Sequence, residues 1–189
     1  MSVLPDWKIK SDVVIEPKAS GIRREGVVSF GITSYGYDAR IGYKFKVFKP
    51  YPCTVIDPKN FDQRMLEDVD LTGVPNANIV IPPHSFVLAE TVEHFEIPRD
   101  CLAIVLGKST YARCGLIVNC TPLEPEWKGV VTIELSNTTD LPMKVYCGEG
   151  ICQVYFLKGD GTCEISYADK KGRYQSQTGV TTPTVDKGN

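Results

Sequence analysis

Residues 107–113, which read Gly-Lys-Ser-Thr-Tyr-Ala-Arg, gather the groups best suited to hold an anion. A strand-like run, 102–106, leads into the glycine, and a helical turn after it would point free backbone N–H groups at a ligand. Lys108 and Arg113 add positive charge, and Ser109 adds a hydroxyl donor on the helix face of Arg113, four residues on. A capped helix with a solvated arginine is the alternative, but the combination favours an anion site.

The same letters resemble the end of a phosphate-binding P-loop. That motif requires a glycine five residues before Gly107, where this sequence has Leu102. The alternating strand and helix pattern of P-loop proteins is also missing. We therefore exclude a P-loop.

Glu134 is a carboxylate in the middle of an apolar strand-like run. Because side chains alternate along a strand, Val131, Ile133 and Leu135 fall on one face, and Thr132 and Glu134 fall on the other. The alternation alone slightly favours a glutamate that faces water. The functional alternative is a carboxyl in a pocket with a raised pKa, suited to general acid–base chemistry.

The loop 119–127 contains two prolines and two acids in nine residues, which is typical of a rigid loop. Rigid loops often carry ligand contacts. Glu124 is the acid most restrained by its neighbours, whereas Glu126 is as well explained by a solvated surface.

His94 and Glu96 match one half of the zinc-dependent nucleobase deaminase signature, His-x-Glu. The other half, Pro-Cys-x-x-Cys, is absent from the sequence. With only two histidines in the chain, a catalytic zinc site of ordinary composition is hard to assemble. We therefore expect His94 to be a strand residue near the surface and expect no zinc or other protein-bound metal.

The elements that must position these residues are short strands rich in Val, Ile, Tyr and Phe, separated by Pro and Gly turns. Their spacing predicts an all-β distorted barrel or jelly roll, with a short helix at 108–114. The expected strands are 13–15, 44–48, 79–81, 86–92, 102–106, 116–118, 130–135, 144–146 and 151–157.

Length and composition predict one globular domain, 1–189, of net charge -2. This charge makes polymeric nucleic acid an unexpected partner. We expect no membrane span and no secretory signal, so the seven cysteines indicate reduced thiols and a cytoplasmic location. The polar segment of about 159–189 is either a frayed tail or a segment that orders over the active site.

In combination, these motifs resemble the dCTP deaminase family over nearly the whole chain. The residues that carry the resemblance are 34–40, 107–119, 127–134, 149–153 and 166–179. The resemblance implies a homotrimer of distorted β-barrels of the trimeric dUTP diphosphatase type, with active sites between subunits. It implies hydrolytic deamination of dCTP to dUTP and ammonia without zinc, feeding dUMP and dTTP synthesis. Mg²⁺ would enter with the substrate triphosphate, and dTTP is a candidate feedback inhibitor.

The resemblance also assigns roles residue by residue. Glu134 falls on the catalytic acid–base glutamate, Ser109 on a serine that helps to hold the attacking water, and Arg113 on an essential arginine. The implied substrate contacts are Lys108, Ser109, Thr110, Tyr111, Ala112, Arg113, Glu124, Thr132, Ile133, Glu134, Gln153, Tyr167, Arg173 and Gln177.

This sequence departs from the family pattern in three places. The loop before Trp127 is shorter, Pro122 stands where alanine is common, and Arg173 stands where lysine is common. The closest alternative is a bifunctional dCTP deaminase and dUTP diphosphatase that gives dUMP and pyrophosphate. Its usual Ala-Gly pair followed by an acid is missing from the loop 119–127. A further alternative is a non-catalytic nucleotide-binding trimer.

Overall fold

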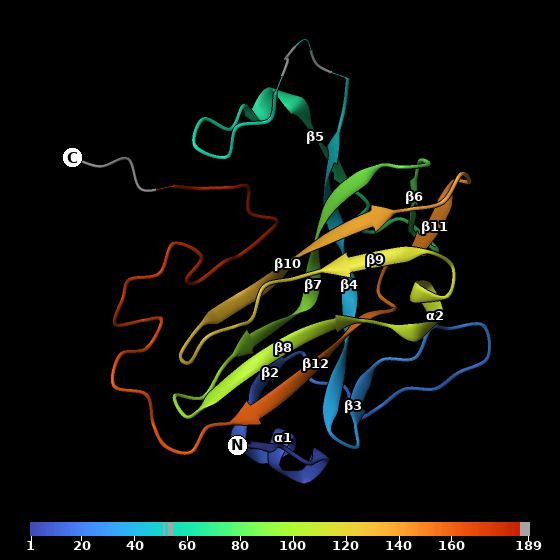
Figure 1. The fold of residues 1–189 in the computed structure, drawn as a ribbon. Helices are drawn as coiled ribbons and strands as arrows, with labels where there is room; N and C mark the ends of the chain where they lie inside the picture. Colours follow the sequence, from blue (N-terminus) through green and yellow to red (C-terminus); the bar gives the residue numbers. More distant parts are fainter. Residues whose placement is uncertain (51, 53–54, 186–189) are drawn as a thin grey trace.

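The computed structural model describes residues 1–50, 52 and 55–185. Most of the strands join in one curled, ten-stranded sheet (Figure 1). The strands are β1 (Ser2–Val3), β2 (Val14–Glu16), β3 (Gly31–Thr33), β4 (Gly36–Phe48), β5 (Leu66–Asp70), β6 (Asn78–Ile81), β7 (Phe86–Glu96), β8 (Cys101–Gly107), β9 (Leu116–Asn119), β10 (Lys128–Asn137), β11 (Met143–Tyr146) and β12 (Gly150–Lys158). The helices are α1 (Asp6–Asp12), the 3₁₀ turn η1 (Gln63–Met65) and α2 (Ser109–Ala112).

The sheet runs in the order β8–β12–β4–β7–β10–β9, and all these pairs are antiparallel. The strands β6 and β11 form a separate pair. The curl brings the two ends, β8 and β9, side by side (Figure 1). Instead of a strand ladder, one residue pair links β8 to the loop after β9. Ala103 donates to Leu123 O (3.0 Å) and accepts from Leu123 N (2.8 Å). The result is a distorted, partly closed barrel.

The core lies inside this curl. On β10 the alternation is as the sequence predicts, with Val131, Ile133 and Leu135 buried. On β7 and β4, Phe95 packs edge-on against Tyr37, with ring centroids 6.0 Å apart. Because the inner face of β10 is fixed by this apolar packing, the opposite face, which carries Glu134, is held in a defined orientation.

The predicted all-β barrel with short helices is confirmed. Each of the nine expected strands overlaps an observed strand, and α2 lies within the helix expected at 108–114. The sequence interpretation missed β1, β3, β5, α1 and the first half of β4. Polar residues and glycines interrupt β4, and three of the five residues of β5 are acidic, so the composition of both strands is weakly strand-like. They form strands because they pair with each other across the sheet.

No helix among the described residues combines the length and the apolar character that a membrane crossing would require.

Candidate active site

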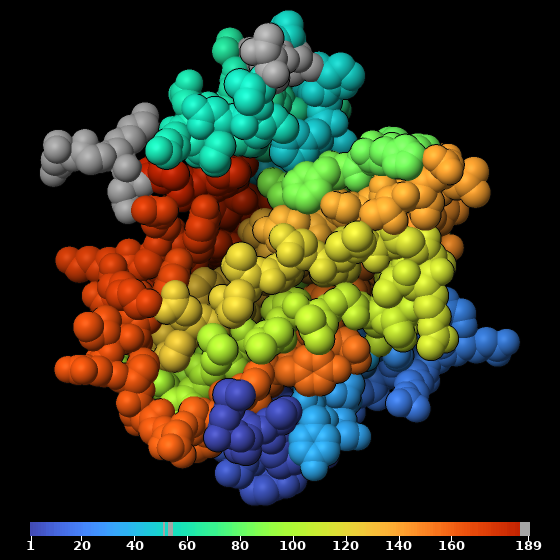
Figure 2. All heavy atoms as spheres, in the orientation of Figure 1, coloured from blue at the N-terminus to red at the C-terminus, as the bar shows by residue number. Residues whose placement is uncertain are grey.

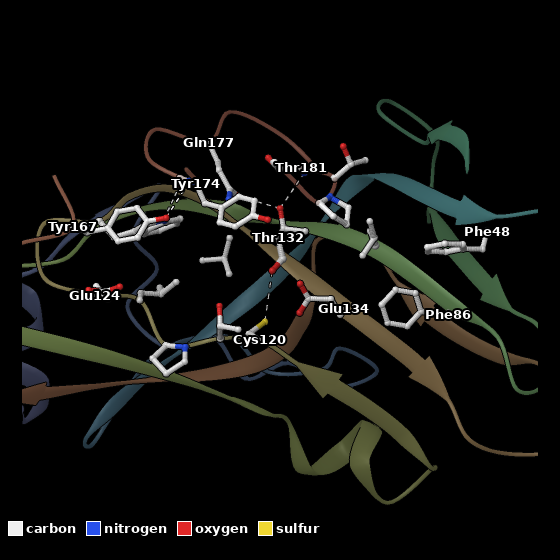
Figure 3. A pocket seen from close by; sticks show the side chains of 18 residues that line it. Phe48, Phe86, Cys120, Glu124, Thr132, Glu134, Tyr167, Tyr174, Gln177 and Thr181 are labelled. Carbon is white, nitrogen blue, oxygen red and sulfur yellow. Dashed lines mark hydrogen bonds between the residues drawn. The ribbon is translucent and has the colours of Figure 1, made fainter. Parts of the chain in front are cut away.

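A pocket of about 650 Å³ opens on the outer face of β10 (Figure 3). Its walls come from the end of β4, from β7, the loop 120–127, β10 and the C-terminal segment. Thr132 and Glu134 project into it from β10, with Phe86 and Leu88 on the neighbouring strand β7. The pocket therefore combines an apolar wall with a few polar side chains, as binding sites for small molecules commonly do.

The carboxyl of Glu134 is the group in this pocket with the greatest capacity for chemistry. Its Oε2 atom is buried and has no hydrogen-bond partner among the described residues. Burial raises the pKa of Glu134 to about 7, against a smaller opposing effect of its own backbone N–H. A carboxyl with this pKa can both accept and release a proton near neutral pH. The water-facing alternative, which the alternation slightly favoured, is therefore wrong.

Thr132 connects β10 to the C-terminal segment. Its Oγ1 donates to Gln177 Oε1 (2.9 Å) and accepts from Thr181 N (3.1 Å). The backbone of the segment joins the same strand, because Val130 N donates to Gln177 O (3.0 Å). A parallel bridge also joins Gly129 and Gln177. These bonds fix both Thr132 and Gln177 at the pocket.

The remainder of the C-terminal segment packs along the same wall, as the orange-to-red atoms in Figure 2 show. The indole of Trp127 donates to Tyr174 O (2.8 Å). The hydroxyl of Tyr167 accepts from Tyr174 N (3.0 Å), and Lys170 pairs with Glu124. Residues 159–185 contain no helix or strand, yet these bonds fix their path over the pocket.

The loop 120–127 is held by backbone hydrogen bonds at its middle and at its end. Leu123 bonds to β8, as described above, and Glu126 N donates to Ile97 O (3.0 Å). Ile97 N in turn donates to Trp127 O (2.9 Å). These backbone bonds agree with the rigid loop that the two prolines predicted. Thr121, earlier in the same loop, lines the pocket.

The turn 107–113 is built differently from the sequence expectation. Ser109, Thr110 and Arg113 are exposed around α2, and the side chain of Tyr111 is buried in the core. Lys108 is also buried, and its ammonium forms an ion pair with Asp38. The charge of Lys108, which the sequence predicts to help hold an anion, therefore lies inside the protein beside Asp38.

Within one chain, most of the predicted residues form two groups, and three lie outside both. The pocket brings together Glu124, Thr132, Glu134, Tyr167 and Gln177, whereas Lys108, Ser109, Thr110, Tyr111, Ala112 and Arg113 lie on the turn and do not line it. Ile133 points into the core, Gln153 lies on β12 beside Asp38, and Arg173 is exposed on the C-terminal segment.

Sequence reasoning missed several residues of the pocket. Phe86 and Leu88 could have been found, since they alternate on β7 and pair across the sheet with Ser136 and Glu134. Other missed lining residues are Phe48, Cys120, Tyr174, Thr181, Thr182 and Pro183. Those of the C-terminal segment have no periodic pattern, so only the fold reveals their position.

The described residues contain no group of three or more His, Cys, Asp or Glu side chains arranged to hold a metal ion. His94 is a half-buried residue of β7, opposite Glu16 and Val130, and does not line the pocket.

The curled sheet and its pocket define a mostly-β protein with a binding site for a small molecule, and comparisons with known proteins identify its family. The family model described as "dCTP deaminase-like" matches residues 8–159, and the chain belongs to this family. The dCTP deaminase of Paramagnetospirillum magneticum is 57% identical over 189 residues, covering 98% of this chain and 100% of the relative. That of Acidobacterium capsulatum is 53% identical over 188 residues, with the same coverage.

A solved structure supports the fold. The crystal structure of 2'-deoxycytidine 5'-triphosphate deaminase from Agrobacterium tumefaciens matches with a TM-score of 0.60 at 17% identity. The match covers 83% of this chain and 48% of that longer chain.

Gly129 allows the C-terminal segment to approach β10. A Cβ atom at this position would lie 2.7 Å from Gln177 N and 2.9 Å from Gln177 O, and the backbone φ is +144°. Overpacking of this kind costs about 1–3 kcal/mol. We predict that Gly129→Ala weakens the attachment of the C-terminal segment to β10. Tryptic cleavage at 170–173 should become about tenfold faster, because its rate follows the fraction of molecules in which the segment is detached. Gly161→Ala, which meets no atom within 4 Å, is the control; equal cleavage of the two variants would contradict the prediction.

The pKa of Glu134 predicts a pH-dependent stability. Between its ordinary value of 4.5 and about 7, the folded protein keeps a proton that the unfolded chain has released. Raising the pH through this window therefore destabilises the wild type, and above it the full cost of burying the charge remains. We predict that Glu134→Gln melts at a higher temperature than the wild type at pH 8. The gap should close near pH 4.5, and a gap that does not change with pH would refute the prediction.

Proposed function

We propose that this protein catalyses the hydrolytic deamination of dCTP to dUTP and ammonia. The observation that carries the proposal is the buried carboxyl of Glu134, with its pKa raised to about 7, at the pocket. It occurs in a chain that matches relatives called dCTP deaminase over their whole length.

In the proposed reaction, the carboxylate of Glu134 takes a proton from a water molecule held by Ser109 and the Thr121–Glu124 loop. The hydroxide adds to C4 of cytosine, and Glu134 passes the proton to N3. A further proton transfer through the same carboxyl lets the amino group leave as ammonia, and the C4 carbonyl of uracil forms. General acid–base catalysis of this kind contributes about 10²–10⁴-fold, so positioning of the base and water supplies the rest.

The substrate contacts follow from the two groups of residues. Thr132, Gln177, Tyr167 and Glu124 surround the position of the nucleoside beside Glu134, and Ile133 contributes through its backbone. The exposed turn residues Ser109, Thr110, Ala112 and Arg113, with Arg173, bind the triphosphate. Exposed donors and cations suit a phosphate chain, and Arg can bind it with two parallel hydrogen bonds.

We also propose that the protein acts as a homotrimer with active sites between subunits. The pocket that holds Glu134 is not lined by the turn of its own chain, so the turn of a neighbouring subunit supplies the anion-binding groups. Exposed apolar side chains near the β8–β9 junction, Leu106 (53%) and Ile117 (54%), suit a surface that a second copy covers.

No metal takes part in the proposed step at the cytosine, and Mg²⁺ enters only with the triphosphate that it neutralises. A cytoplasmic location suits both the nucleotide pool and the free thiols of the described cysteines. The dUTP product feeds dUMP and dTTP synthesis, which makes dTTP a candidate feedback inhibitor.

The decisive assay incubates the purified protein with dCTP and Mg²⁺, separates the nucleotides and measures ammonia. We predict dUTP with equimolar ammonia, unchanged by a zinc-selective chelator.

Glu134→Gln should lose about 10²-fold or more of kcat, because it cannot exchange a proton. Retention of more than about a tenth of the activity would exclude the proposed role. In the assay of the wild-type protein, accumulation of dUMP and pyrophosphate would identify the bifunctional alternative. Binding of dCTP without turnover would identify a non-catalytic protein.

Mixed trimers test whether the sites are shared. Glu134→Gln and Arg113→Ala are each expected to be inactive alone. When the two variants are co-expressed, a site that takes its turn from one chain and its glutamate from another is intact in about a quarter of random pairings. We predict that activity returns towards that fraction. If each active site instead took Glu134 and Arg113 from one and the same chain, every site would lack one of them. The mixture would then stay as inactive as either variant.

A further inference from the structure

Asp38 and Lys108 form the buried ion pair nearest to the turn 107–113. Each residue is only 6% exposed, although charged side chains are rarely buried unless they are paired. Asp38 lies within β4, and Lys108 lies between the end of β8 and the start of α2. The pair therefore connects β4, which lies between β12 and β7 in the sheet, to the residue that directly precedes α2.

The second carboxylate oxygen of Asp38 has its own partner. Oδ1 accepts from Gln153 Nε2 (3.1 Å), while Oδ2 accepts from Lys108 Nζ. Gln153 lies on β12, paired with Asp38 on one side and with Leu106 on the other. One carboxylate thus holds side chains from two segments that the sequence predicted to contact the substrate.

The backbone of Lys108 explains why its side chain matters for the turn. Lys108 O accepts from Tyr111 N (3.1 Å) and Ala112 N (3.0 Å), so this carbonyl begins α2. Lys108 N donates to Ile151 O (3.2 Å), which joins the same residue to β12. A movement of Lys108 would therefore move Ser109 and the rest of the exposed turn with it.

The stem of Lys108 is confined as well. It passes over Gly150, where an added Cβ would lie 3.2 Å from Lys108 Cδ and 2.0 Å from Ser29 O. The ammonium has been taken out of water and is compensated by Asp38, so leaving this pair would uncover two buried charges.

We propose that Asp38 is a positioning residue, which anchors Lys108 and Gln153 and thereby sets the geometry of the anion-binding turn. This role deepens the proposed function and rests on it. Lys108 acts as the anchor of the turn through Asp38, whereas Ser109, Thr110 and Arg113 meet the phosphates. The competing assignment is a Lys108 that leaves Asp38 and binds the triphosphate directly.

A double-mutant cycle separates the two assignments. The variants are Asp38→Asn, Lys108→Met and the double variant, which removes both charges at nearly constant volume. Lys158→Met is the matched control, because it removes a partly exposed ion pair with Asp100 (2.8 Å) from the same strand as Gln153. Thermal unfolding is measured for all variants. The kcat and KM for dCTP are measured far below the lowest unfolding temperature, so that unfolded protein does not contribute.

An anchoring role predicts that each single variant unfolds on the order of 10 °C lower, because one buried charge loses its partner. It also predicts a loss of about 10²-fold in kcat/KM in the folded protein, as expected when a binding turn is misplaced. The double variant should recover most of both losses, and the control should unfold within about 2 °C of the wild type.

Two results would overturn the proposal. One is a Lys108→Met variant as stable as the wild type, with a raised KM that the double variant does not recover; this would make Lys108 a phosphate ligand. The other is an Asp38→Asn variant unchanged in both measurements. If the wild type did not turn over dCTP, the proposed function would fail, but the unfolding cycle would still decide whether the pair anchors the turn.

Discussion

The site depends on the placement of one carboxyl where water cannot fully solvate it. Burying Glu134 without a partner for Oε2 costs free energy, and this cost is also what raises its pKa to about 7. The fold nevertheless keeps Glu134 in this position, because Val131, Ile133 and Leu135 on the opposite face of β10 are packed in the core. Rotating Glu134 into solvent would turn these apolar side chains out of the core, so packing on one face maintains the chemistry on the other.

The same division between stable packing and exposed chemistry recurs at the turn 107–113. Its buried members, Lys108 and Tyr111, fix the turn to β4 and to Tyr146 N, which donates to the Tyr111 hydroxyl (3.0 Å). Its exposed members are left available to a ligand. A family signature of this kind therefore mixes residues that bind with residues that hold the binding residues in place.

Much of this arrangement could be predicted from local patterns. The alternation around Glu134 and the two prolines before Trp127 are local signals, and they gave the strand and the loop correctly. The burial of Lys108 was not predictable, because its partner Asp38 is 70 residues away and the sequence shows only a lysine after a glycine. The position of the wall formed by Tyr174 and Thr181 was not predictable either. It depends on a bond from Trp127 to Tyr174 O and on a bond from Thr181 N to Thr132 of β10, not on any periodicity.

The bridge between Gly129 and Gln177 has a consequence for solubility. On the side away from β7, β9 pairs only with residues 134–137 of β10, so the first half of that edge would present unpaired backbone groups. The C-terminal segment covers it, with Val130 N donating to Gln177 O. Exposed sheet edges invite other chains to add a strand and aggregate. The segment that completes the pocket therefore also covers a sheet edge that could otherwise pair with strands of other chains.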